Sequence, residues 1–221
     1  MGGRKAEKEA LHDIREIYSK IKPEIEIRLA EFKDVWENGS EEDVFAELVF
    51  CLFTPQSKAK SCWATLLKLR EEGLLLEGGE QEVLRECNLV RFKYKKSGFV
   101  VEARQHFVKG GEVSIRPLLA SFGKPPEMRN WLVENIKGLG YKEASHFLRN
   151  VGRGEELAIL DRHILKNLVL LGVIKEIPKS LTPTRYLGIE KKMLVFCKKS
   201  NIPMDHLDLV LWYKEAGEVF K

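Results

Sequence analysis

The sequence predicts an all-α fold. Apolar residues recur three and four positions apart along most of the 221 residues, as in Leu11, Ile14, Ile17 and Tyr18, and this spacing is typical of amphipathic helices. Alternating strand patterns bounded by Asn-Gly or Asp-Gly turns are scarce. Hydrophobic residues make up 44% of the chain, enough to bury a core, and we expect about ten or more short helices without an internal repeat.

The expected helices follow one another along the chain. After the first amphipathic segment, Pro23 suits the first turn of a second helix that runs to Trp36. Ser40 is a good cap for the apolar run Val44–Phe53, because three acidic residues then face the positive end of the helix dipole. Thr54-Pro55 ends that helix. Further helices are expected from Gln56 to Leu67, from Tyr141, from Asp161, and at about 80–88, 93–109, 114–122, 126–137, 181–199 and 205–218.

The charge is unevenly distributed. The net charge is only +4, but residues 1–50 carry 8 basic and 13 acidic side chains, residues 51–110 carry 11 and 7, and residues 111–221 carry 18 and 13. The stretch Arg91–Lys109 is the most basic, and we expect it to supply phosphate contacts for a polyanionic partner. A solvated helix face is the alternative interpretation.

Metal and membrane chemistry are not expected. The four cysteines lie too far apart for a C-x-x-C pair, and the five histidines form no H-x-x-x-H pattern. The longest apolar stretches, Leu48–Phe53 and Leu168–Ile174, are too short to cross a bilayer. The first ten residues carry no apolar targeting segment. We therefore expect a cytoplasmic protein without a membrane partner.

The segment Leu132–Ala144 carries the clearest local signal. One helix ends near Lys137, Gly138-Leu139-Gly140 forms a tight turn, and Tyr141 opens the next helix. Two glycines one residue apart permit positive φ and expose backbone amides, which together with a helix N-terminus suit a DNA phosphate. We therefore expect Gly138, Leu139, Gly140 and Tyr141 to contact DNA. An ordinary turn between two helices would show the same glycine pair.

Two charged residues follow this turn at informative positions. Lys142 lies two residues beyond the second glycine, where the positive end of a helix dipole favours the neutral amine that a nucleophile needs. Asp161 lies 19 residues later, at the start of the next substantial helix. A solvated lysine and a helix cap are the structural alternatives.

The segments IKGLGYKEA (136–144) and DRHI (161–164) resemble the helix-hairpin-helix DNA glycosylase superfamily, in which G-x-G-x-K is followed by D-x-H. The match covers Gly138, Gly140, Lys142, Asp161 and His163. The segments FTPQSKAKSCW (53–63), AILDRHIL (158–165) and LDLVLWY (207–213), with a terminal lysine, resemble the short 8-oxoguanine DNA glycosylase/AP lyases of archaea and thermophilic bacteria. This resemblance spans about residues 40–221.

The resemblance implies two helical subdomains with an active-site cleft between them. Residues 38–155 would form a six-helix barrel that contains the helix-hairpin-helix at about 132–150, and residues 1–37 plus 156–221 would form the second subdomain. Gln56, after the Thr54-Pro55 break, would be the wedge that fills the space left by an extruded nucleotide. A polar residue at a helix start is the alternative for Gln56.

The resemblance also implies the chemistry. Lys142 would attack C1′ and form a Schiff base, Asp161 would stabilise the positive charge that develops on the sugar, and β-elimination would cut the strand. Trp212 would stack on the oxidised base, Asp208 would contact it, and Lys221 would close the pocket. As alternatives, Trp212 could belong to the core, Asp208 could be a first-turn acid, and terminal lysines are common.

The expected partner is double-stranded DNA that contains an oxidised guanine, bound by a monomer located at the nucleoid. No cofactor is expected to be required. The resemblance allows a monovalent cation on the backbone carbonyls of Glu134, Ile136 and Leu139, and a lone cysteine in the C-terminal region, Cys197, excludes the iron–sulfur cluster of related enzymes. The alternatives are a glycosylase/lyase for another damaged base and a non-catalytic helix-hairpin-helix DNA-binding module.

Overall fold

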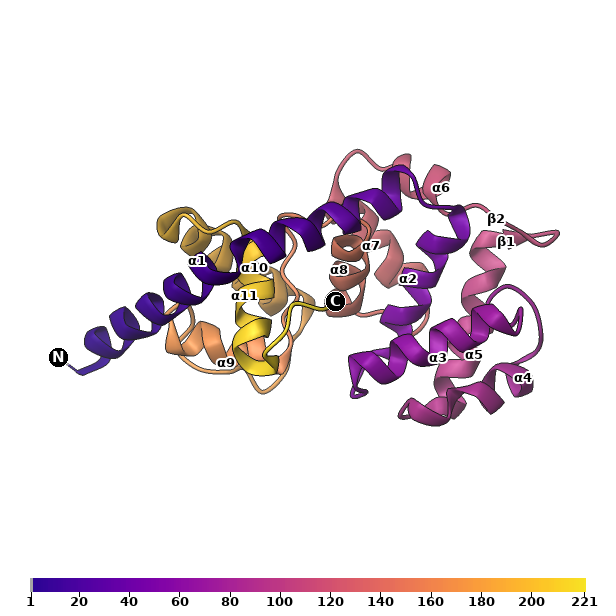
Figure 1. Cartoon of the computed structure of the whole chain (residues 1–221), viewed down its shortest axis with the longest axis horizontal. Coiled ribbons are helices and arrows are strands. Elements are labelled where there is room, and N and C mark those ends of the chain that lie inside the picture. Colours follow the sequence, from indigo (N-terminus) through magenta and orange to yellow (C-terminus); the bar gives the residue numbers. More distant parts are fainter. Residues whose placement is uncertain (1) are drawn as a thin grey trace. The chain divides into compact units, whose positions relative to one another are not determined.

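The computed structural model describes the backbone of residues 2–221 and the side chains from Lys5 onward. Within these residues the chain is mainly helical, which confirms the all-α prediction (Figure 1). The helices are α1 (Gly2–Glu37), α2 (Glu41–Phe53), α3 (Ala59–Glu71), α4 (Glu80–Glu86), the 3₁₀ turn η1 (Cys87–Leu89), α5 (Lys93–Phe107), α6 (Arg116–Ala120), α7 (Pro125–Asn135), α8 (Tyr141–Asn150), α9 (Arg162–Leu170), α10 (Pro183–Ser200) and α11 (Met204–Ala216).

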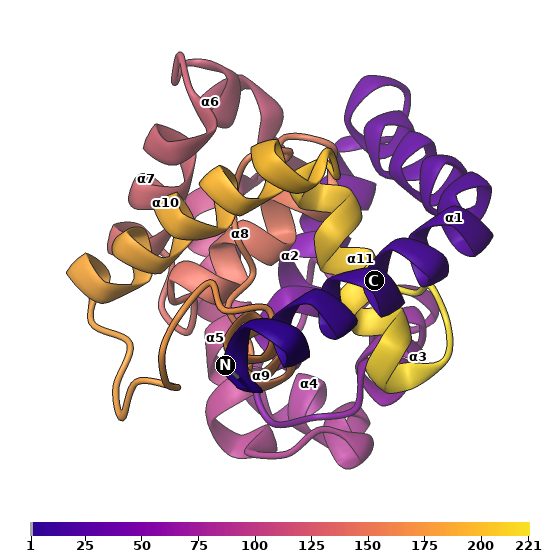
Figure 2. The same ribbon diagram turned by 90° about the vertical axis from the view of Figure 1, so that its left-hand side faces the viewer.

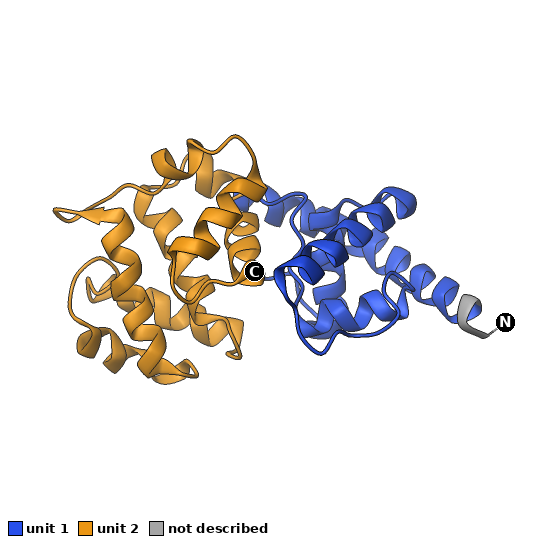
Figure 3. Cartoon of the chain, turned by 180° about the vertical axis from the view of Figure 1, so that it is seen from behind, with its two compact units in different colours: residues 1–32, 154–221 blue, residues 33–153 orange. Residues whose placement is uncertain are grey.

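The chain divides into two compact units, which Figure 3 shows in different colours. Unit 1 consists of residues 1–32 and 154–221, and unit 2 consists of residues 33–153. The sequence predicts two subdomains with boundaries between residues 37 and 38 and between residues 155 and 156, and these boundaries stay a prediction. Each unit is described below by itself.

Unit 2 is built around helix α2. Every residue from Val44 to Phe53 is buried, and α2 packs against α3, α5 and α8. A helix that is apolar on all sides requires such a central place. Its start is fixed as the sequence predicts: the Ser40 hydroxyl accepts the Asp43 amide at 3.1 Å, and the Asp43 carboxylate accepts the Ser40 amide at 2.8 Å.

Unit 1 is held together by α1, α9, α10 and α11. Helices α9 and α10 both pack against α11. Helix α1 crosses α11 (Figures 1 and 2), and at this point the Tyr18 hydroxyl is 3.1 Å from His206 Nδ1. Buried Ile14, Ile21 and Ile25 form the inner face of α1 in this unit.

The prediction of two helices separated at Pro23 is wrong, because α1 is continuous and contains Pro23. A proline inside a helix removes one hydrogen bond and crowds the carbonyl four residues earlier. Pro23 and Ser19, the residue with that carbonyl, are both exposed. Water can therefore satisfy the Ser19 carbonyl, while the apolar face of α1 remains in the core.

The helix expected at 93–109 ends at Phe107 and is followed by a small hairpin. Strands β1 (Val108–Lys109) and β2 (Glu112–Val113) pair antiparallel. Gly110 and Gly111 connect them with φ of 59° and 82°. Two consecutive residues with positive φ form the tight turn that hairpins favour, and glycine adopts it without steric cost.

Candidate active site

The turn between α7 and α8 adopts the conformation that its glycines allow. Gly138 has φ of +96°, and a Cβ at this position would lie 2.4 Å from Cδ2 of Phe99 in α5. Gly140 caps α8 with φ of −95°. Gly138 is thus required for both backbone conformation and space, whereas Gly140 is an ordinary extended cap.

Buried contacts fix this helix-hairpin-helix. Leu139 is 5% exposed and anchors the turn in the core. Arg129 of α7 is buried, donates to the Ser145 hydroxyl of α8 at 3.2 Å, and lies 5.2 Å from the ring centre of Tyr141. The same arginine therefore connects both helices and the first residue of α8.

Two amides of the turn are used inside the hairpin. The Leu139 amide donates to the Ile136 carbonyl at 3.2 Å, and the Gly140 amide donates to Glu143 Oε2 at 3.3 Å. An anion at this helix N-terminus would therefore be bound by the first-turn amides of α8, because these have no carbonyl four residues earlier in the helix.

Lys142 lies in the first turn of α8, next to an acid. Its ammonium is 3.5 Å from Glu143 Oε1, and its side chain is 24% exposed. Glu143 therefore bridges the cap of the hairpin and the lysine. The amine is partly accessible to a substrate and is held at the N-terminal end of α8.

Gln56 lies in the turn between α2 and α3, also in unit 2. It is exposed and has φ of +56°, a left-handed conformation that is uncommon for a non-glycine residue. The Ser57 amide closes the turn by donating to the Thr54 carbonyl at 3.0 Å. The turn thus presents the Gln56 side chain to solvent.

The expectation that the whole basic stretch Arg91–Lys109 contacts phosphates is wrong for two of its members. Lys96 is 3% exposed and bonds to the turn around Gln56, and Arg104 is 7% exposed and donates to the carbonyls of Leu74, Leu75 and Gly78. Both cations satisfy backbone carbonyls inside unit 2 and are not available to DNA.

Asp161 lies in unit 1 and caps helix α9. Its Oδ1 accepts the Ile164 amide at 2.7 Å, and the residue is half-buried. Within the residues that the structure describes, the other carboxylate oxygen makes no hydrogen bond. The capping alternative from the sequence is therefore correct, and it leaves one oxygen available for chemistry.

Trp212 lies beside the start of α9. It is half-buried, and its ring meets that of His163 edge-to-face, with 5.7 Å between the ring centres. Glu215 joins the two helices: it lies 3.3 Å from His163 Nδ1 and accepts the Asn167 amide at 3.1 Å. The hydrogen bond from Asn167 lowers the pKa of Glu215, so this link between α9 and α11 is anionic near neutral pH.

Asp208 and Lys221 belong to the same unit. Asp208 is 6% exposed and lies one helical turn before Trp212 in α11. It is not the first-turn acid of this helix, which is Asp205. The chain turns at Gly217, with φ of +79°, and continues through buried Val219 to half-buried Lys221.

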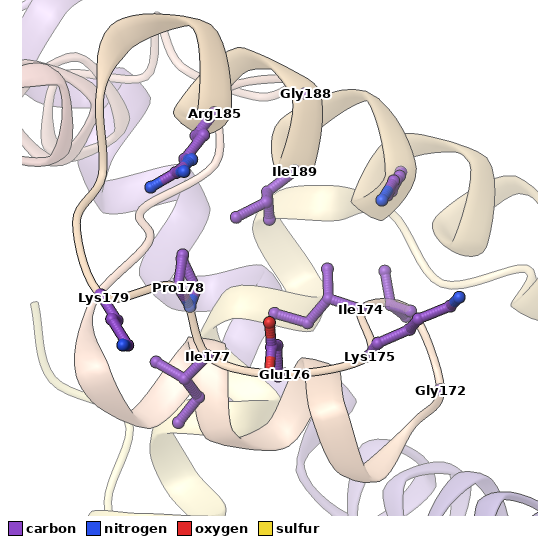
Figure 4. Close-up of a pocket in the computed structure, with 12 residues that line it drawn as sticks. Gly172, Ile174, Lys175, Glu176, Ile177, Pro178, Lys179, Arg185, Gly188 and Ile189 are labelled. Atoms are coloured by element: carbon purple, nitrogen blue, oxygen red, sulfur yellow. The ribbon is translucent and has the colours of Figure 1, made fainter.

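A pocket of about 750 Å³ lies in unit 1, between the segment after α9 and the first turns of α10 (Figure 4). Apolar Ile174 and Ile189 form part of its wall, and four cations and one acid complete its charge: Lys175, Lys179, Arg185, Lys192 and Glu176. None of the site residues predicted from the sequence lines it.

No group of three or more histidine, cysteine or acidic side chains suited to a metal ion occurs in the described part of the chain. The cysteines Cys51, Cys62, Cys87 and Cys197 are buried and free. Burial raises the pKa of Cys62 to about 11 and those of Cys87 and Cys197 to about 12, which makes them unreactive thiols. No described helix has the length and apolar character of a membrane span.

The structure places two residues beside Lys142 that the sequence analysis did not assign to the site. Glu143 pairs with Lys142 directly, and the spacing of Gly140 and Glu143, that of a capping box, was the signal that could have found it. Lys96 interacts electrostatically with Lys142, and no local pattern distinguishes it from half-buried Lys93 and exposed Lys95.

The comparisons with known proteins agree with one another. The family model Ogg-HhH, described as 8-oxoguanine DNA glycosylase, matches residues 25–202. The "8-oxoguanine DNA glycosylase/AP lyase" of Fusobacterium nucleatum is 50% identical over 213 residues, which cover 96% of this chain and 98% of that protein.

Solved structures give the same relationship. The crystal structure of the Thermotoga maritima 8-oxoguanine DNA glycosylase has a TM-score of 0.84 and 36% identity, and the match covers 97% of this chain and all of that one. The Methanocaldococcus jannaschii 8-oxoguanine glycosylase/lyase, in complex with a 15mer DNA containing 8-oxoguanine, has a TM-score of 0.86 and 36% identity over 96% of this chain and 99% of that one.

Proposed function

The chain belongs to the 8-oxoguanine DNA glycosylase family, and we infer from this membership that it excises 8-oxoguanine from DNA and cleaves the resulting abasic site. One observation carries the assignment of the chemistry: a partly accessible lysine, Lys142, follows the glycine turn of the helix-hairpin-helix and opens its second helix. The enzyme is thus a DNA N-glycosylase and abasic-site lyase.

We propose that Lys142 is the nucleophile. Its neutral amine attacks C1′ of the deoxyribose, the bond between C1′ and the base breaks, and the base leaves with the bonding electrons and takes up a proton. Opening of the sugar ring then gives a Schiff base between Lys142 and C1′. This imine acidifies the C2′ protons, and loss of one of them expels the 3′ phosphate by β-elimination.

Asp161 supplies the negative charge for this reaction. The oxygen that does not cap α9 would stabilise the positive charge that develops on the sugar as the base leaves, as carboxylates do in glycoside cleavage. Because the capping hydrogen bond fixes the carboxylate, this charge would be positioned before the substrate binds.

DNA would bind through the hairpin. The backbone at Gly138, Leu139, Gly140 and Tyr141 would contact a phosphate, and the exposed side chain of Gln56 would fill the space left by the extruded nucleotide. Counterion release makes such binding weaken steeply with added salt. A monovalent cation could add to this contact: the Ile136 carbonyl accepts the Leu139 amide at 3.2 Å, and a carbonyl oxygen has a second lone pair that an ion can use.

Base recognition would come from the C-terminal part of unit 1. Trp212 offers an aromatic face, buried Asp208 offers an acceptor for the N7 proton of 8-oxoguanine, and Lys221 would close the site around the base. The edge-to-face contact with Trp212 is made by His163, which follows Asp161 by two positions in the chain. The enzyme would act as a monomer at the nucleoid.

Borohydride trapping on a panel of single-lesion duplexes tests this function. Wild-type enzyme should form a covalent adduct with 8-oxoguanine DNA and cut the strand, whereas Lys142→Gln should do neither. Lys137→Gln is the matched control, because this exposed lysine pairs with Glu102 at the same hairpin and should remain trappable. A trappable Lys142→Gln variant would contradict the assignment of the nucleophile.

The same panel separates the alternatives. Faster cutting of an oxidised pyrimidine or an alkylated base would assign the enzyme to another lesion. A protein that binds every duplex with equal affinity and forms no adduct would be a non-catalytic DNA-binding module.

A further inference from the structure

Lys96 of α5 is a buried lysine whose ammonium satisfies the end of another helix. Its Nζ donates to the carbonyls of Phe53 and Pro55 at 2.7 Å each and to the Ser57 hydroxyl at 3.1 Å. The residue is 3% exposed. All three protons of the ammonium are therefore used, and all three acceptors belong to the C-terminus of α2 and the turn that follows it.

This turn requires an external donor. The last carbonyls of a helix have no intrahelical amide partner, and Pro55 offers none. Gln56 in addition adopts a left-handed backbone conformation, φ +56°, which a non-glycine residue maintains only if its surroundings enforce it. The Arg91 amide, in the segment before α5, is a second donor to this turn and reaches the Ser57 hydroxyl at 3.0 Å.

Several ionisable groups of unit 2 interact with the charge of Lys96. The groups that interact with its charge are Cys62 of α3, Cys87 of η1, and Lys142 and Glu143 of α8. Burial lowers the pKa of Lys96 to about 8, so it is mostly charged at neutral pH.

We propose that Lys96 is a positioning residue, which fixes the turn that carries Gln56. Lys96 would thus act on the wedge without touching DNA. This inference rests on the proposed role of Gln56.

Three variants test the proposal. Lys96→Gln removes the charge and retains a hydrogen-bond donor. Ser57→Ala removes one acceptor and leaves the Lys96 ammonium in place. Arg104→Gln is the matched control, because Arg104 is a buried cation of the same helix that donates to the carbonyls of Leu75 and Gly78, away from the turn.

Two measurements are made on the full chain. Hydrogen exchange at the Ser57 amide, which donates to the Thr54 carbonyl, reports the turn. Excision of 8-oxoguanine from duplex DNA, compared with borohydride trapping on single-stranded abasic-site DNA, reports the wedge, because only the duplex requires a nucleotide to be extruded. Lys96→Gln should speed exchange about tenfold or more, and it should slow excision from the duplex more than trapping on the single strand. Ser57→Ala should change both measurements in the same direction, and Arg104→Gln should change neither.

Either measurement can refute the proposal. Wild-type exchange rates in both Lys96→Gln and Ser57→Ala refute the effect on the turn, and equal losses by Lys96→Gln on duplex and single-stranded DNA refute the link to the wedge. If wild-type enzyme forms no adduct at all, the proposed function is wrong, whereas the exchange rates still decide whether Lys96 fixes the turn.

Discussion

Replacing Gly138 by alanine tests whether the hairpin turn depends on this glycine for both conformation and space. Forcing a side chain into positive φ costs about 1–2 kcal/mol. The new Cβ would also lie 2.4 Å from Cδ2 of Phe99, and relieving such an overlap in a packed core costs about 1–3 kcal/mol. We therefore expect Gly138→Ala to lower the free energy of unfolding by about 2–5 kcal/mol, measured by urea denaturation.

Gly140→Ala is the internal control for this measurement. Its φ is −95°, and the nearest atom to a new Cβ is the flexible carboxylate of Glu143 at 3.1 Å. We expect a loss of less than about 1 kcal/mol. If Gly138→Ala destabilises the protein no more than Gly140→Ala does, the argument from φ and the Phe99 contact is refuted.

Three further predictions concern charge. Burial lowers the pKa of Lys96 from 10.5 to about 8, so the unfolded chain binds more protons than the folded chain between these pH values. When the pH is raised from 8 to 10.5, the free energy of unfolding of wild type should therefore rise relative to that of Lys96→Gln by about 3 kcal/mol. Urea unfolding measures this difference, and a difference that stays constant with pH would contradict the prediction. Asp161→Asn keeps a capping oxygen, so it should lower the rate of single-turnover excision by ~10²-fold or more at nearly unchanged stability. Asp161→Ala should in addition lower the free energy of unfolding by about 1 kcal/mol. Equal excision rates for wild type and Asp161→Asn would show that the carboxylate takes no part in the chemistry. Deleting Lys221 should lower the ratio of excision rates for oxidised and normal guanine, and an unchanged ratio would exclude Lys221 from base recognition.

The features that the sequence predicted correctly are local. The Gly138 turn and the Ser40 cap are each encoded within a few consecutive residues, because a left-handed turn needs glycine and a helix N-terminus needs a short polar side chain. The start of α9 at Asp161 follows from the same capping rule.

The features that the sequence did not predict depend on distant partners. Lys96 and Arg104 look like members of a basic surface, but their acceptors are carbonyls between 26 and 43 positions earlier in the chain. Pro23 looks like a helix start, and only the exposure of that side of α1 shows why the helix continues through it. Packing decides these cases, and no pattern within a single helix records it.

Asp161 shows that a structural and a functional interpretation of one residue need not compete. A carboxylate has two oxygens, and the cap uses Oδ1 alone, at 2.7 Å from the Ile164 amide. The hydrogen bond removes the rotational freedom of the side chain and holds the carboxylate at the positive end of the α9 dipole. An anion that must stabilise a cationic sugar benefits from both effects, since a fixed charge needs no reorganisation during the reaction. The cap at the start of α9 is therefore the reason why this aspartate, and not a mobile surface acid, suits the proposed role.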